Sequence, residues 1–141
     1  MRELTVPATI DNVEKVTDFV NGQLEEAGCP MQTQMQLDVA IDELFSNIAH
    51  YAYDPGTGMA TVQVDMEKDS RAAVVTFLDQ GRPYDPLAKK DPDVSLAAHD
   101  RPTGGLGIFL VKRIMDDVSY EYREGHNILR ILHTTNSFPF C

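Results

Sequence analysis

The chain has 141 residues, of which 43% are apolar and 24% are charged, and this length and composition suit one globular domain over residues 1–141. Its formal net charge of −10 argues against direct nucleic-acid binding, which needs a basic surface, and favours a protein partner with a basic face. No apolar run approaches the roughly 20 residues that span a bilayer, and the first residues lack the apolar core of a signal peptide, so we expect a cytoplasmic protein without membrane contact.

The N-terminal segment predicts a short strand and an amphipathic helix. Residues 2–6 alternate enough for a strand, and Pro7 ends it. A helix is expected over residues 12–27, because apolar side chains recur there at helical spacing. Thr9 or Asp11 is placed to serve as its N-cap.

A longer helix is predicted over residues 31–53. Its apolar stripe, which should face the core, consists of Leu37, Ile41, Leu44, Phe45, Ile48 and Ala52. Glu43 and Asn47 lie beside this stripe, one turn apart on the same face. A carboxamide oxygen can bind magnesium, and a carboxylate can accept a proton from an attacking hydroxyl or water. Taken alone, the pair is more often an ordinary helix edge with solvated polar groups.

Two strands follow, and the second ends on a carboxylate. Residues 60–67 and 72–79 predict an antiparallel hairpin. Asp79 closes the second strand, where it could accept a hydrogen bond from the exocyclic amine of a purine. Gly81 would let the backbone approach the base, because glycine has no β-carbon. The same Asp-x-Gly sequence is also common in turns that bind nothing.

A long irregular segment, residues 80–103, leads to a glycine strip. A loop of this length in a small domain is usually functional or mobile. Gly104, Gly105 and Gly107 occupy three of four positions and open a short helix at its N-terminal end. The free amides and the dipole of a helix N-terminus favour an anion such as phosphate. A hinge for the preceding loop is the alternative interpretation of the strip.

The last regular elements are two strands, residues 118–123 and 127–133, predicted to pair across residues 124–126. Helices cluster early in the chain, and most strands pair with their neighbours along it. This order predicts an α+β fold, a two-layer sandwich in which helices cover one face of a mixed, mostly antiparallel sheet.

The order of these features resembles the ATP-binding fold shared by gyrase, heat-shock chaperones, histidine kinases and MutL. Residues 43–47 resemble the N-box of that superfamily, and residues 79–83 and 105–107 resemble its two glycine boxes. Residues 84–103 resemble its ATP lid. The resemblance covers the chain up to about residue 134 and implies a Bergerat-type sandwich that binds ATP.

Within this superfamily, the short chain is similar to the anti-sigma-factor serine kinases. The similarity is carried by residues 43–53 and 105–111. It implies binding of ATP with Mg²⁺, sequestration of a sigma factor, phosphorylation of a serine on an anti-sigma-factor antagonist, and often a homodimer. The alternative is a non-catalytic regulator in which the nucleotide only shapes a protein-binding surface.

The resemblance also implies roles for individual residues. Glu43 would be the general base, Asn47 the magnesium ligand and Asp79 the acid that reads adenine. Gly81 would allow close approach to the base. The phosphate cradle would consist of Gly105, Leu106, Gly107 and Ile108.

Two positions depart from the family pattern. Many relatives carry a histidine eight residues after the glutamate, where this chain has Tyr51, and His50 stands one place early. Relatives also often have Gly-Thr near the last hairpin, on the adenine side of the site. Here the segment reads Gly125-His126-Asn127, and the sequence leaves open whether Asn127 replaces the threonine.

Overall fold

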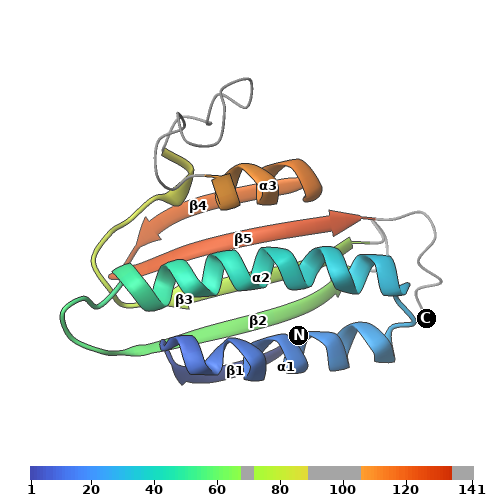
Figure 1. Ribbon diagram of the computed structural model, residues 1–141, viewed down its shortest axis with the longest axis horizontal. Helices are drawn as coiled ribbons and strands as arrows, with labels where there is room; N and C mark the ends of the chain where they lie inside the picture. The colour runs from blue at the N-terminus through green and yellow to red at the C-terminus, as the bar shows by residue number, and fades with distance from the viewer. Residues whose placement is uncertain (68–71, 89–105, 135–141) are drawn as a thin grey trace.

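The computed structural model describes residues 1–67, 72–88 and 106–134. Within them the chain forms a five-stranded sheet in the order β1-β2-β3-β5-β4 (Figure 1). Gly104, Gly105, most of the predicted loop and the tail lie outside the described residues. The expected two-layer α+β sandwich is confirmed by the arrangement of the described elements.

The strands lie within one or two residues of their predicted bounds. They are β1 (Arg2–Pro7), β2 (Met59–Glu67), β3 (Ala72–Asp79), β4 (Asp117–Arg123) and β5 (His126–Thr134). Both predicted hairpins are present, β2 with β3 and β4 with β5. A mixed, mostly antiparallel sheet was expected. All four strand pairings among the described residues are antiparallel.

The described helices cover one face of the sheet (Figure 1). They are α1 (Val13–Glu26), α2 (Met31–Tyr51) and α3 (Leu106–Ile114), with 3₁₀ turns at Ile10–Asn12 and Pro86–Ala88. Helix α3 begins inside the glycine strip, earlier than expected, and α2 ends two residues early. Within the described parts of the chain, no helix combines the length and apolar character that a bilayer crossing requires.

The expected N-cap of the first helix is wrong. A 3₁₀ turn precedes α1, and neither Thr9 before that turn nor Asn12 before the helix makes a side-chain cap bond. Instead Asn12 Nδ2 donates to Thr9 Oγ1 at 3.0 Å and to the Pro7 carbonyl at 2.9 Å. The threonine hydroxyl is therefore occupied by a side chain that fixes the entry to α1.

The core lies between the helices and the sheet. Leu37, Ile41, Leu44 and Phe45 of the predicted α2 stripe are fully buried. They pack against strand residues that alternate toward the helices, such as Val75 and Phe77. Burial of each such side chain stabilises the fold by roughly 1.5–3 kcal/mol. Asp79 continues this alternation, so the end of β3 directs a carboxylate to the helix side of the sheet.

Candidate functional site

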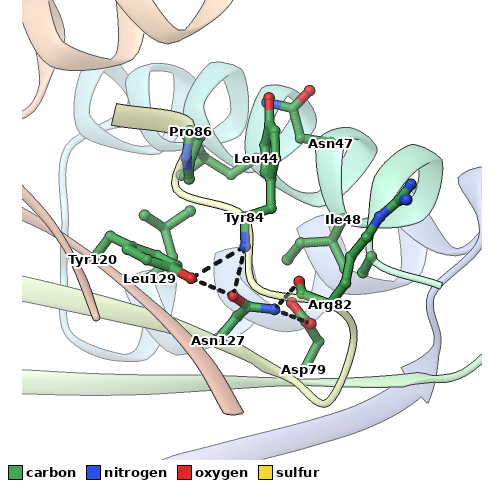
Figure 2. Close-up of a pocket in the computed structure, with 11 residues that line it drawn as sticks. Leu44, Asn47, Ile48, Asp79, Arg82, Tyr84, Pro86, Tyr120, Asn127 and Leu129 are labelled. Carbon is green, nitrogen blue, oxygen red and sulfur yellow. Dashed lines mark hydrogen bonds between the residues drawn. The ribbon is translucent and has the colours of Figure 1, made fainter. Parts of the chain in front are cut away.

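A pocket lies between the second half of α2 and the ends of β3 and β5 (Figure 2). The empty space among its lining atoms is about 380 Å³, part of which is open to solvent. Its walls are Leu44, Asn47, Ile48, Ala52, Asp79, Arg82, Tyr84, Pro86, Tyr120, Asn127 and Leu129. The structure thus brings Asn47 and Asp79, which the sequence singled out separately, to the same cavity.

Asp79 is 5% exposed and is held in place by two donors to one oxygen. Its Oδ1 accepts a hydrogen bond from the Gly81 amide at 2.8 Å and another from Asn127 Nδ2 at 2.9 Å. Among the described residues no hydrogen bond reaches the other oxygen, Oδ2. The carboxylate therefore has one oxygen engaged by the protein and one available as an acceptor.

Asn127 comes to this site through the pairing of two distant strands. It lies opposite Asp79 in the β3–β5 register, so its side chain reaches the same face of the sheet. Its Oδ1 accepts hydrogen bonds from the Tyr84 amide at 3.2 Å and from the Tyr120 hydroxyl. Sequence reasoning did not single out Tyr120, because a tyrosine in an edge strand carries no motif.

Gly81 meets protein backbone in this structure. A β-carbon at this position would lie 2.2 Å from the Ala52 carbonyl oxygen, at the end of α2. The next amide, of Arg82, donates to that same oxygen at 3.0 Å. The missing side chain thus lets the segment after β3 pack on the end of α2, a reason that the sequence did not reveal.

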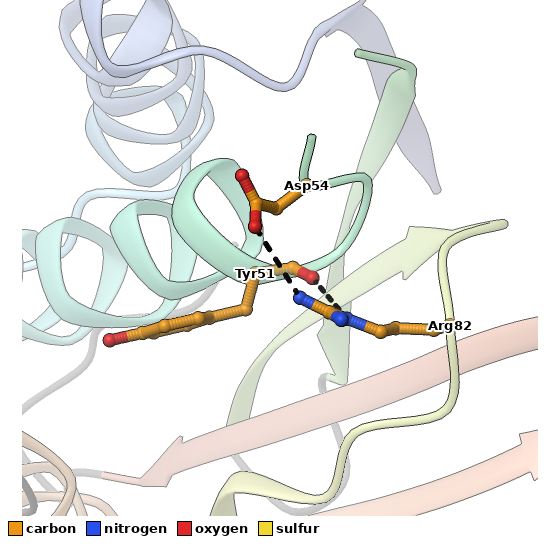
Figure 3. A network of polar contacts seen from close by, with 3 residues as sticks. All are labelled: Tyr51, Asp54 and Arg82. Atoms are coloured by element: carbon orange, nitrogen blue, oxygen red, sulfur yellow. Dashed lines mark hydrogen bonds and ion pairs between the residues drawn. The ribbon is translucent and has the colours of Figure 1, made fainter. Parts of the chain in front are cut away.

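Arg82 and Tyr51 also tie this segment to α2 (Figure 3). Arg82 Nε donates to the Tyr51 carbonyl at 2.9 Å, and its Nη2 lies 4.0 Å from Asp54 Oδ2. This ion pair is largely exposed and contributes little to stability. The Tyr51 ring stacks on Tyr84 with centroids 5.5 Å apart. The tyrosine at the family's histidine position thus contacts the start of the predicted lid.

Glu43 lies against the first turn of α3. A β-carbon on Gly107 would come within 1.9 Å of Glu43 Oε2, so glycine is needed for this approach. Ile108 is 8% exposed, and its side chain belongs to the core, which leaves only its backbone for a ligand. Because Glu43 and Asn47 are one turn apart, the start of α3 and the pocket are neighbours along α2.

Two tyrosine hydroxyls near Asp79 are held in their protonated form. Burial raises the pKa of Tyr53 and of Tyr120, and the negative charge of Asp79 raises both further. Tyr53 Oη donates to the Met59 carbonyl at 2.6 Å and accepts from the Gln80 amide at 2.8 Å. These phenols therefore act as fixed hydrogen-bond groups around the strand ends.

A helix-covered antiparallel sheet with this pocket beneath its long helix defines a known class of ATP-binding domain. Residues 6–132 match the family described as Histidine kinase-like ATPase domain, and the chain belongs to this family. The resemblance to the ATP-binding fold is thereby confirmed.

Individual relatives point to one branch of the family. The chain is 31% identical over 127 residues to the serine-protein kinase RsbW of Halalkalibacterium halodurans, covering 87% of this chain and 76% of that protein. It is 30% identical over 103 residues to the serine/threonine-protein kinase BtrW of Bordetella bronchiseptica, covering 73% and 70%. These relatives confirm the predicted similarity to serine kinases.

A solved structure supports the fold independently. The crystal structure of the RsbU and RsbW domains of Rv1364c from Mycobacterium tuberculosis superposes with a TM-score of 0.64. The sequence identity is 15%, and the match covers 95% of this chain but 32% of the larger one. At this identity the likeness establishes the architecture alone.

Proposed function

We propose that the chain is an ATP-dependent serine kinase that holds a sigma factor inactive and phosphorylates a serine of an anti-sigma-factor antagonist. One arrangement carries this proposal: Asn47 of α2 and Asp79 of β3 line the same pocket, and α2 sets Glu43 against the start of α3. The relatives named serine-protein kinase RsbW supply the reaction class.

The residues present fit ATP with magnesium. The free Oδ2 of Asp79 suits the exocyclic amine of adenine, and the first-turn amides of α3 suit phosphate. Among the described residues, no three His, Cys, Asp or Glu side chains gather into a metal site. A magnesium ion would therefore take the Asn47 carboxamide oxygen, phosphate oxygens and water as ligands.

The proposed reaction assigns one step to Glu43. ATP with magnesium supplies the phosphoryl group. The Glu43 carboxylate orients the partner's serine and accepts its Oγ proton, while the Oγ–P bond forms and the bond from the γ-phosphorus to the β-phosphate oxygen breaks, leaving ADP. General-base help of this kind contributes about 10²–10⁴-fold, and positioning with charge neutralisation supplies the rest.

The proposal also includes a lid over the nucleotide, a protein partner, a homodimer and a cytoplasmic location. Residues 84–103 would form the ATP lid, of which residues 84–88 are described and contribute Tyr84 and Pro86 to the pocket wall. The net charge of −10 suits a partner with a basic surface. We propose further that two copies of the chain form a homodimer and that the protein acts in the cytoplasm.

Transfer of γ-labelled phosphate from ATP to a candidate antagonist tests the function. We expect the wild-type protein to label a serine, and Glu43→Gln to bind ATP as before but to transfer about 10²–10⁴-fold more slowly. Asp42→Asn is the matched control, because Asp42 is the exposed neighbour of Glu43 on α2. Intact ATP binding with no label on any antagonist would favour the non-catalytic regulator instead.

A further inference from the structure

The Asn127 amide has a single workable orientation at the pocket floor (Figure 2). Its Nδ2 faces two acceptors, Asp79 Oδ1 and the Arg82 carbonyl, each at 2.9 Å. Its Oδ1 faces two donors, the Tyr84 amide at 3.2 Å and the Tyr120 hydroxyl. A half-turn of the amide would set its oxygen against a carboxylate and a carbonyl, and its NH₂ group against the Tyr84 N–H, and all three contacts are unfavourable.

Tyr120 adds a second donor at Asn127 Oδ1, beside the Tyr84 amide. Its hydroxyl donates to Asn127 Oδ1 and accepts from the Tyr84 amide, whose nitrogen lies 3.3 Å away. Because burial keeps the Tyr120 phenol protonated, the donor is always present at this oxygen. A network whose members are all satisfied holds one geometry in the folded protein.

Asn127 has no donor left for a bound base. It is 6% exposed, and its NH₂ group is already shared among Asp79 and backbone carbonyls. Asn127 therefore acts on Asp79 rather than on a ligand. It occupies Oδ1 together with the Gly81 amide and so turns Oδ2, the oxygen without a described partner, toward the cavity.

We infer that Asn127 and Tyr120 are positioning residues that present Asp79 as a one-oxygen acceptor and thereby select a 6-amino purine over a 6-oxo purine. This inference rests on the proposed ATP site. An adenine amine donates to the free carboxylate oxygen, whereas the 6-oxygen of hypoxanthine or guanine brings an acceptor against an acceptor. A site built around one such hydrogen bond discriminates strongly, because the wrong group leaves a buried polar atom unpaired.

Calorimetric titrations with Mg-ATP and Mg-ITP test the inference, since inosine triphosphate differs from ATP by an oxygen in place of the amine. We expect the wild-type protein to prefer ATP. In Asn127→Ala the ratio of ATP to ITP affinity should fall about tenfold, the equivalent of one hydrogen bond to a charged group. In Tyr120→Phe, which loses a neutral hydrogen bond to Asn127, it should fall by about two- to tenfold. Affinity for ITP should change little, because the variants disturb the reading of the amine and not the phosphate contacts.

Tyr122→Phe is the matched control. Tyr122 lies opposite Asn127 in the β4–β5 register and is 45% exposed, and its hydroxyl makes no hydrogen bond with a described residue. Its removal should leave the ratio unchanged. Tyr120→Phe keeps the aromatic ring and so provides a folded variant, checked by its thermal midpoint, even where Asn127→Ala does not fold.

The outcomes separate this inference from the proposed function. An ATP to ITP ratio that is unchanged in folded Tyr120→Phe, or a wild-type protein that binds ATP and ITP equally, would overturn the inference and leave ATP binding intact. A wild-type protein that binds neither nucleotide would overturn both.

Discussion

The carboxylate of Glu43 lies directly on Gly107, where a β-carbon would come within 1.9 Å of Oε2 and 2.1 Å of Cδ. The contact joins the helix that carries the proposed base to the helix whose first turn faces the proposed phosphates. Gly107 has helical backbone geometry, so the requirement for glycine here is one of space. Glu43 and Gly107, which the sequence presented as parts of two separate features, thus form one contact.

Substitution of Gly107 should disturb this contact. Gly107→Ala must push the Glu43 carboxylate aside, which the end of a flexible side chain allows at little cost in stability. We expect slower phosphate transfer with little loss in the free energy of unfolding, measured by γ-labelled ATP and urea denaturation, because the displaced group is the proposed base. Gly22→Ala is the control, because no atom lies within 4 Å of a β-carbon there. That helix-interior change should instead stabilise by about 0.5–1 kcal/mol, and equal effects at the two positions would contradict the account.

Gly81→Ala tests the packing of the segment after β3 on the end of α2. The new β-carbon would meet the Ala52 carbonyl oxygen at 2.2 Å, and that oxygen also accepts the Arg82 amide. We expect a loss of about 2 kcal/mol or more in the free energy of unfolding, because backbone atoms cannot move aside as a flexible side chain can. Unchanged urea denaturation would show that the segment does not depend on this approach.

His133 gives the fold a defined pH dependence. It is 6% exposed, its Nε2 donates to Gln36 Oε1 at 2.6 Å, and its Nδ1 is buried without a partner in the described structure. Burial lowers the pKa of His133 below the usual 6.5, against a smaller raising effect of the Asp116 charge. In the interval between the folded and unfolded pKa values, the unfolded chain binds more protons, so stability must fall as the pH drops below 6.5.

The measurement compares urea denaturation at about pH 7.5 and about pH 5.5 in wild type and His133→Gln. We expect the wild-type free energy of unfolding to decrease on acidification, and the variant to lose part of that decrease. The two proteins share every titratable group except His133, so the difference between their pH dependences reports on this residue and its interaction with Asp116. An identical pH dependence in the two would refute the assignment.

Much of the fold follows from local patterns in the sequence. The α2 stripe and the strand 72–79 agree with the prediction nearly to the residue, because helical and alternating periodicity can be recognised from residues close together in the sequence. The same patterns placed Asn47 on a helix face and Asp79 at a strand end. Their meeting in one pocket rested on a family resemblance, since no local rule joins the two segments.

Features that depend on tertiary contact could not be predicted. Asn127 reaches Asp79 only through the β3–β5 register, which pairs distant residues. Gly81 and Gly107 looked like ligand-binding glycines, yet each makes room for protein atoms, at Ala52 and at Glu43. The N-cap of α1 was missed because the Asn12 side chain competes for the Thr9 hydroxyl.

The central claim is that the pocket holding Asn47 and Asp79 binds ATP, and calorimetric titration of wild type and Asp79→Ala with Mg-ATP tests it most directly. Asp65→Ala is the control, because that acid is exposed and lines a separate depression of the surface. We expect saturable binding by wild type and by Asp65→Ala, and affinity at least about tenfold weaker for Asp79→Ala. Equal affinity in all three proteins, or no binding by wild type, would contradict the claim.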